Sequence, residues 1–325
     1  DDLVISKILQ SRIDNQAETL HREVTVMANR KTWSDWAESY FSGNEWLYFQ
    51  GNSSNGFIIE KSNRNYIRFS VNSSSTEVRA YGDAEFCESI MGVVTEKFTV
   101  VTSYIEWVYG ADGSRVNVPL NRDRLPVAEM YPFLKGESLE SYYDRYMASS
   151  ANILLLIGPP GTGKTTFIRG LLAHTNSSAI VSYDAGILDK DGFFARFIES
   201  DDNVMVLEDS DAFLKPRSDG NTMMHRFLNV GDGLVTTKGK KMIFSTNLPS
   251  IRDIDSALVR PGRCFDIVEF KPLSLYHADI LTKIIGGEVP LRKGGEVMEY
   301  SLAELFNQQS ESTKSAKTNR KVGFI

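Results

Sequence analysis

The sequence predicts an α/β domain with a mostly parallel sheet over residues 151–270, preceded by an α+β domain over residues 1–120. From residue 151, short apolar runs alternate with helical stretches, which is typical of parallel βαβ units. Before residue 121, most apolar runs have a period of two and are separated by Asn, Ser and Gly, which is typical of antiparallel strands and turns. A chain of 325 residues suits two or three domains.

The N-terminal part divides into a helical segment and a set of short strands. Residues 1–42 are expected to be helical, because apolar residues such as Leu9, Ile13 and Leu20 fall near helical spacing. Strands are expected in "WLYFQ", "GFIIEK", "NYIRFSV" and "TEVRAY". Residues 82–98 predict a helix, and a hairpin is expected around "GADG" in the last part of the 1–120 domain.

Two further segments flank the predicted parallel sheet. Residues 121–150 predict a connector that contains two prolines and ends in a helix, "ESLESYYDRYMAS". Residues 271–309 contain the helical stretches "LSLYHADILTKIIGG" and "SLAELFNQ". Residues 310–325 are rich in Ser, Thr and Lys and predict a flexible tail.

A phosphate-binding loop is the strongest motif in the chain. "GPPGTGKT" matches G-x-x-x-x-G-K-[ST] and lies between an apolar strand and a helix, where backbone N–H groups can surround phosphate oxygens. Lys164 is expected to bridge the β- and γ-phosphates of ATP, and the Thr165 hydroxyl to bind Mg²⁺. The candidate ATP-binding residues are Gly158, Pro159, Pro160, Gly161, Thr162, Gly163, Lys164, Thr165 and Thr166.

Acidic residues follow the apolar strand in "VMVLEDSDAF", in the order Glu208, Asp209. Ligands of parallel sheets lie at the carboxyl ends of strands, and neighbouring residues there point in different directions. One acid can therefore face Mg²⁺ while the other faces the water that attacks the γ-phosphate. Asp211 fits the start or cap of the next helical turn slightly better than a part in this chemistry, and both readings stay open.

Two later motifs carry further candidate catalytic residues. The strand "KKMIFSTN" ends at Asn247, whose amide can hold the attacking water; a turn asparagine is the alternative. In "SALVRPGRCFD", Arg260 and Arg263 flank a rigid Pro-Gly turn, which suggests an arginine finger rather than two surface arginines. A finger that serves a neighbour's nucleotide requires a ring.

These motifs, in this order, resemble the AAA family of ring ATPases over roughly residues 131–308. Within that family, "LEDSDAFL", "FLNVGDG" and "ALVRPGR" are similar to the clade of the mitochondrial Rieske-protein translocase (Bcs-type). The resemblance implies a P-loop NTPase (AAA+) domain over residues 151–270 and a small helical lid over residues 271–309. It also implies Mg²⁺-dependent ATP hydrolysis in a homo-oligomeric ring, a hexamer or heptamer.

The resemblance assigns a role to each catalytic candidate. Glu208 would support Mg²⁺ through water, Asp209 would polarise the attacking water, and Asn247 would be the sensor. Arg260 and Arg263 would reach the adjacent subunit's site.

The chain also departs from the family pattern. The interval from Asn247 to Arg260 is longer than usual, Ser256 replaces a proline, and no membrane helix precedes the ATPase domain. Residues 183–186 are not the aromatic-apolar-Gly loop of peptide-threading relatives, and Phe193, Phe194 and Phe197 fit a helix face that packs in a core. Threading of unfolded chains is therefore not supported.

Composition narrows the function. A net charge of −6 provides no global attraction to nucleic acid, and Cys87 and Cys264 suit a reducing, cytoplasmic location. The favoured function is an ATPase that remodels or moves an unknown protein partner bound through residues 1–120. The alternative is a nucleic-acid-linked ATPase of the replication or loader type, supported only by "KSAKTNRK" near the C-terminus. A switch that binds ATP without turnover is disfavoured, because Lys164, Asp209, Asn247 and Arg260 are all present.

Overall fold

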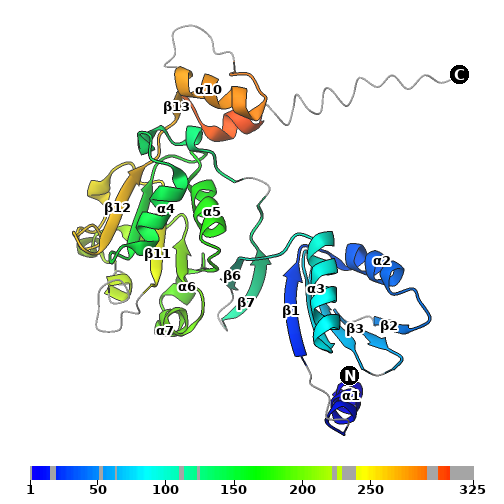
Figure 1. The fold of residues 1–325 in the computed structure, drawn as a ribbon. Helices are drawn as coiled ribbons and strands as arrows, with labels where there is room; N and C mark the ends of the chain where they lie inside the picture. The colour runs from blue at the N-terminus through cyan, green and yellow to red at the C-terminus, as the bar shows by residue number, and fades with distance from the viewer. Residues whose placement is uncertain are drawn as a thin grey trace, which may run out of the picture. The chain divides into compact units, whose positions relative to one another are not determined.

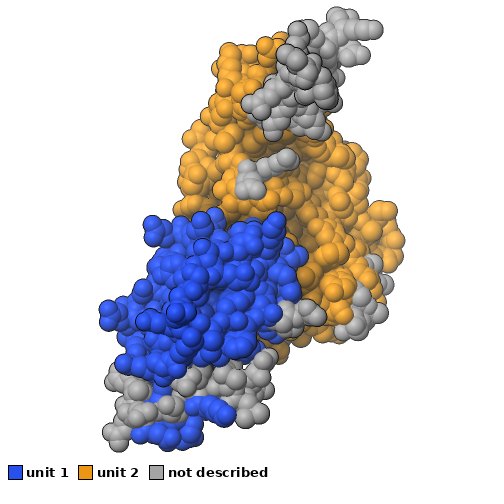
Figure 2. All heavy atoms as spheres, turned by 90° about the vertical axis from the view of Figure 1, so that its right-hand side faces the viewer, with its two compact units in different colours: residues 1–104 blue, residues 105–325 orange. Residues whose placement is uncertain are grey.

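The computed structural model separates into two compact units, residues 1–104 and residues 105–325 (Figures 1 and 2). The residues it describes are 2–14, 20–50, 54–62, 64–109, 113–122, 125–221, 225–228, 239–290 and 299–307. The expected tail over residues 310–325 and the end of "FLNVGDG" lie outside these ranges. Within them, no helix is long and apolar enough to cross a membrane.

The first unit is built on a five-stranded antiparallel sheet with the strand order β1-β5-β4-β3-β2. Helices α2 and α3 pack on one face of this sheet and bury Trp33, Cys87 and Val94 against Phe69 and Val78. The elements are α1 (Asp2–Asp14), β1 (Leu20–Val26), α2 (Arg30–Tyr40), β2 (Trp46–Gln50), β3 (Asn55–Glu60), β4 (Tyr66–Val71), β5 (Thr76–Gly82) and α3 (Ala84–Lys97).

Strand β1 differs from the expectation of helix over residues 1–42. It pairs with β5 along its whole length, from Leu20 opposite Gly82 to Val26 opposite Thr76. Leu20, Val24 and Val26 all pack against the core of this unit, as residues on one face of a strand do. The four-residue spacing of Leu20 and Val24 fits a helix and a strand equally well, so local periodicity could not separate the two.

The hairpin before residue 120 belongs to the second unit and not, as expected, to the first. Strand β6 (Tyr104–Tyr109) pairs in parallel with β9 (Ala179–Val181), with Ile105 opposite Ala179 and Trp107 opposite Val181. Strand β7 (Ser114–Pro119) lies beside β6 at the edge of the same sheet. The boundary between the units therefore falls at residue 104 rather than 120, because backbone pairing with β9 places the hairpin in the second unit.

The second unit contains a seven-stranded sheet with the order β12-β8-β11-β10-β9-β6-β7. Strands β12 through β6 run parallel, as predicted for residues 151–270. Strands β8, β10 and β11 are buried on both faces, which explains the apolar runs ILLLI, VMVL and MIF within them. The remaining strands are β8 (Ile153–Ile157), β10 (Val204–Leu207), β11 (Lys241–Thr246) and β12 (Cys264–Glu269).

Helices cover both faces of this sheet (Figure 1). On one face, α4 (Leu139–Ala148) and α5 (Lys164–His174) share a core with the inward residues of the strands. On the other face lie α6 (Ala185–Leu188) and α7 (Asp191–Glu199). The three phenylalanines of α7 are buried in this second core, which confirms the prediction that they are core residues.

Short elements complete the second unit. The connector forms η1 (Ala128–Met130) and η2 (Pro132–Leu134) before α4, and α10 (Leu275–Ile285) lies in the expected helical region, where residues 302–307 are also helical. Strands β13 (Leu273–Ser274) and β14 (Glu299–Tyr300) pair with each other beside α10. The others are α8 (Asp211–Leu214), η3 (Arg217–Asp219) and η4 (Ile251–Asp253).

Candidate active site

Glycines shape the loop between β8 and α5. Gly158, Gly161 and Gly163 have φ angles of 155°, 77° and 93°, a region that side chains rarely adopt. A Cβ atom on Gly158 would lie 2.2 Å from the Phe270 carbonyl oxygen. Gly163 precedes the first residue of α5, so the free N–H groups of the helix start open onto this loop. The geometry of the loop and the helix start is suited to an anion.

We expect Gly158→Ala to lower the free energy of unfolding by about 2 kcal/mol or more, because both the strained φ and the contact with Phe270 oppose a Cβ. Urea unfolding measures the change. Gly192→Ala is the matched control, because Gly192 lies in α7 and an added Cβ would have no atom within 4 Å. This variant should be neutral or slightly stabilised. Equal midpoints for Gly158→Ala and the wild type would contradict the expectation.

Lys164 is buried within the loop. Its ammonium donates hydrogen bonds to the carbonyl oxygens of Gly158 (2.6 Å) and Pro159 (3.1 Å) and to Asn247 Oδ1 (2.9 Å). Burial lowers the pKa of Lys164, and the nearby carboxylates of Asp209, Asp211 and Glu208 oppose that shift. The positive charge is thus held between the loop carbonyls and the end of β11.

The two acids after β10 face different partners, as predicted. The Thr165 hydroxyl donates to Glu208 Oε1, and the Tyr183 hydroxyl donates to Glu208 Oε2 at 3.0 Å. Asp209 Oδ1 instead accepts from Asn247 Nδ2 at 3.0 Å. Asp209 has a φ of 47°, a left-handed conformation that Asp and Asn tolerate better than most residues. This conformation accompanies the divergence of the two carboxylates.

Asp211 starts the next helical turn, as the preferred reading expected, and its carboxylate has a further role. It is the first residue of α8, and its Oδ1 accepts from the Thr246 hydroxyl and, at 2.9 Å, from the backbone N–H of Asn247. Ser210 reinforces the same connection through hydrogen bonds from its N–H and hydroxyl to the Ser245 carbonyl oxygen, both 2.9 Å. Asp211 therefore fixes the end of β11, from which Asn247 reaches Asp209.

The donor set fits Mg²⁺ that arrives with a nucleotide. One hydroxyl, from Thr165, and one carboxylate, from Glu208, lie side by side. Mg²⁺ is commonly bound by one or two carboxylates together with water and phosphate oxygens. Among the residues described, no group of three or more His, Cys, Asp or Glu could hold a metal by itself. When bound, Mg²⁺ would neutralise charge on the phosphates.

The two candidate arginines lie near the amino-terminal ends of the strands, whereas the phosphate loop lies at their carboxyl ends. They precede β12, whose first residue, Cys264, pairs with Ile153 at the start of β8, whereas the phosphate loop follows Ile157 at the other end. A five-residue strand spans about 16 Å, so these arginines do not face the phosphate loop of their own chain. Arg260 is exposed, whereas Arg263 Nη1 donates to the Ala257 carbonyl oxygen at 2.6 Å.

The lid region contacts the phosphate loop. The Ala303 N–H donates to the Gly161 carbonyl oxygen at 3.1 Å, and a Cβ on Gly163 would lie 2.5 Å from Leu302 Cδ1. Tyr131 of the connector also donates its hydroxyl to the Gly163 carbonyl oxygen at 3.1 Å. Residues far apart in the sequence thus meet at the loop.

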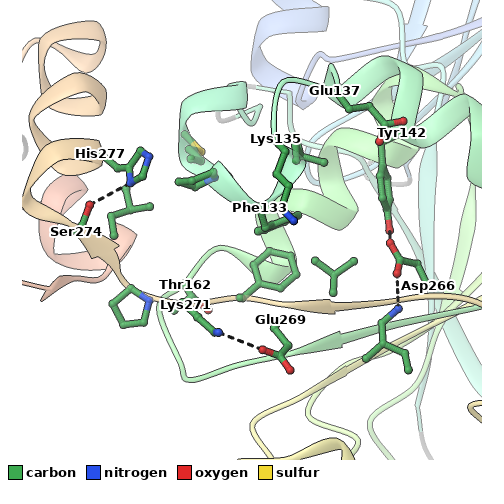
Figure 3. A pocket seen from close by; sticks show the side chains of 18 of the residues that line it. Phe133, Lys135, Glu137, Tyr142, Thr162, Asp266, Glu269, Lys271, Ser274 and His277 are labelled. Carbon is green, nitrogen blue, oxygen red and sulfur yellow. Dashed lines mark hydrogen bonds and ion pairs between the residues drawn. The ribbon is translucent and has the colours of Figure 1, made fainter.

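A cavity of about 730 Å³ lies between the connector, the end of β12 and the start of α10 (Figure 3). The Tyr142 hydroxyl donates to Asp266 Oδ2 at 2.9 Å on one side, and Ser274 and His277 are hydrogen-bonded at 3.0 Å on the other. The phosphate loop lines it only through Thr162, whose hydroxyl is turned back onto the Pro159 carbonyl oxygen. The cavity adjoins the phosphate loop but receives none of the other candidate residues.

The geometry defines a class. A phosphate loop followed by a helix, with two acids and an asparagine at the carboxyl ends of adjacent parallel strands, is the site of a P-loop nucleoside triphosphatase. Residues 154–272 match the family described as "ATPase family associated with various cellular activities (AAA)". The chain therefore contains an AAA ATPase domain. This confirms the predicted α/β fold class and, for residues 154–272, the predicted AAA family.

Two proteins similar to this chain are named as regulatory subunits of the 26S proteasome. The chain is 31% identical over 175 residues to the 26S proteasome regulatory subunit 8 homolog of Schizosaccharomyces pombe, which covers 48% of this chain and 42% of the relative. It is 33% identical over 159 residues to 26S proteasome regulatory subunit 8 of Caenorhabditis elegans, covering 43% and 38%. The chain thus spans less than half the length of these relatives. Neither belongs to the Rieske-protein translocase clade that the sequence motifs suggested.

Proposed function

We propose that this protein is a Mg²⁺-dependent ATPase that converts ATP and water to ADP and phosphate and works as a homo-oligomeric ring. The observation that carries the proposal is the convergence of Lys164, Glu208, Asp209 and Asn247 at one edge of the sheet. These residues follow three adjacent strands of the sheet: Lys164 follows β8, Asn247 follows β11, and Glu208 and Asp209 follow β10.

Each residue of this group has a chemical task in the proposal. Lys164 and the N–H groups of the loop bind the phosphates, and Thr165 and Glu208 hold Mg²⁺. Asp209 polarises the water whose oxygen bonds to the γ-phosphorus as the bond to the bridging oxygen of ADP breaks. Asn247 contacts both Lys164 and Asp209, so it is placed to hold that water.

The position of Arg260 supports the proposed ring. An exposed arginine at the far edge of the sheet cannot complete its own chain's site, but in a heterologous assembly it can face the phosphates of a neighbour. The lid contact at Gly161 supports the further proposal that residues 271–309 respond to nucleotide. A hexamer and a heptamer are both compatible, and single-particle images with ATP would count the subunits.

The biological task that we propose is remodelling or translocation of a protein partner in the cytoplasm. The first unit has its own core, and Leu47 and Phe49 expose apolar surface on its edge strand β2, where a partner could bind. The described free cysteines, Cys87 and Cys264, suit a reducing compartment. The motifs "LEDSDAFL" and "ALVRPGR" support a finer placement near the Rieske-protein translocase clade, which stays a proposal.

The test is phosphate release from ATP by the wild type and by Lys164→Ala. We expect turnover by the wild type, loss of nucleotide binding and turnover in the variant, and no response to added DNA. Salt-sensitive stimulation by DNA would instead favour the nucleic-acid-linked alternative, whose basic tract lies outside the described residues. Nucleotide binding without phosphate release by the wild type would favour a switch.

A further inference from the structure

Both carboxylate oxygens of Glu208 accept a hydroxyl hydrogen bond. Thr165, on the helix that follows the phosphate loop, donates to Oε1, and Tyr183, in the segment after β9, donates to Oε2 at 3.0 Å. The metal-side acid is therefore held from two separate elements. Thr165 was expected in the site from the motif, whereas Tyr183 was not.

The strand register explains why Tyr183 reaches this acid. Strands β9 and β10 are parallel neighbours, and Val181 lies opposite Val206. Two residues further along each strand direction, Tyr183 and Glu208 come side by side at the carboxyl edge of the sheet. Ser182, which links the end of β9 to Tyr183, is buried. Tyr183 itself is 55% exposed, so the tyrosine ring lies at the surface.

The hydrogen bond from Tyr183 favours a fixed orientation of the Glu208 carboxylate. A hydroxyl that donates to a carboxylate makes a stronger hydrogen bond than one that donates to a neutral acceptor. A tyrosine hydroxyl is protonated at neutral pH, so it can donate this hydrogen bond. Exposure of the ring weakens the contact relative to a fully buried one, and we therefore expect a moderate effect on the site.

We propose that Tyr183 is a positioning residue that holds Glu208 against Thr165 and thereby sets the Mg²⁺ concentration at which nucleotide binds tightly. This inference rests on the proposed function of the site as a Mg²⁺-dependent ATPase. Tyr183 does not contact the reacting atoms in the proposal and acts only through the carboxylate.

The test is equilibrium binding of a non-hydrolysable ATP analogue as Mg²⁺ is increased. For Tyr183→Phe, which removes only the hydroxyl, the half-saturating Mg²⁺ concentration should rise about three- to tenfold, while binding without Mg²⁺ stays as in the wild type. Tyr276→Phe is the matched control: Tyr276 lies on α10, is 70% exposed, and should show no shift.

A double variant identifies the path of the effect. In the background of Glu208→Ala, which has no acceptor for the hydroxyl, Tyr183→Phe should cause no further shift in half-saturating Mg²⁺. An unchanged Mg²⁺ dependence in Tyr183→Phe, a shift that persists without Glu208, or weaker Mg²⁺-free binding would each overturn the inference alone. A wild type without any Mg²⁺-dependent nucleotide binding would overturn the proposed function as well.

Discussion

Asp209→Asn is expected to bind ATP within about threefold of the wild type and to lower the rate of hydrolysis about 10²- to 10⁴-fold. The amide has nearly the same size as the carboxylate but carries no negative charge and cannot accept the proton of the attacking water. Asp209 makes its hydrogen bond to Asn247 rather than to the phosphate loop, so its charge is not needed to hold the nucleotide.

The fold should survive this substitution. Asp209 has a φ of 47°, and asparagine is among the few residues that adopt this conformation readily. A loss of activity can therefore be attributed to the chemistry of the side chain rather than to backbone strain.

Single-turnover phosphate release, together with equilibrium binding, separates the two effects, because turnover alone can be limited by product release. Asp279→Asn is the matched control: it makes the same chemical change on α10, where Asp279 pairs with Lys283 at 2.6 Å on an exposed surface. Full activity of Asp209→Asn would exclude Asp209 as the residue that polarises water. Loss of ATP binding would show instead that its charge serves the nucleotide.

The sequence was sufficient to predict the residues that follow the ends of parallel strands. Glu208 and Asp209 come directly after an apolar run, Asn247 follows the last residue of β11, and Lys164 follows β8 across the phosphate loop; the carboxyl ends of parallel strands share one edge. Their convergence needed only the assumption that these runs form one parallel sheet. The strong phosphate-loop motif supplied that assumption.

Tyr183 and Asp211 could not be assigned in this way. The place of Tyr183 depends on the register between β9 and β10, and the role of Asp211 depends on its hydrogen bonds to β11. Neither register nor partner strand is encoded in local periodicity. The same limit explains the misplaced hairpin, because the pairing of β6 with β9 joins segments about 70 residues apart, and loop closure over such a distance leaves no local signature.

The arginine motif was predicted as a pair, and the structure separates its members. Arg263 donates to the Ala257 carbonyl oxygen at 2.6 Å, so it stabilises the turn before β12. Arg260 is exposed at the same turn. Its carbonyl oxygen accepts hydrogen bonds from the backbone N–H groups of Arg263 and Cys264, both at 3.1 Å. The backbone of Arg260 is thus fixed while its side chain faces outward. This makes Arg260 the stronger candidate for the finger.

Arg260→Ala is accordingly expected to lower ATP hydrolysis about 10³- to 10⁵-fold with little change in ATP binding by the isolated chain. The guanidinium would stabilise charge that develops on the neighbour's phosphates during the reaction. Arg263→Ala should instead lower the urea midpoint of unfolding, because it removes the hydrogen bond to Ala257. Steady-state phosphate release and urea unfolding, measured on both variants, compare the two roles.

Mixed rings test whether Arg260 acts on a neighbour. Lys164→Ala abolishes a subunit's own nucleotide site but leaves its Arg260 intact, and Arg260→Ala does the reverse. Since the two sets of residues lie at opposite edges of the sheet, random mixing in equal amounts should restore about one active interface in four. Every interface in a ring of one parent lacks either Lys164 or Arg260, so activity that appears only on mixing requires a finger in trans. A mixture as inactive as its parents, with wild-type activity independent of assembly, would refute the ring.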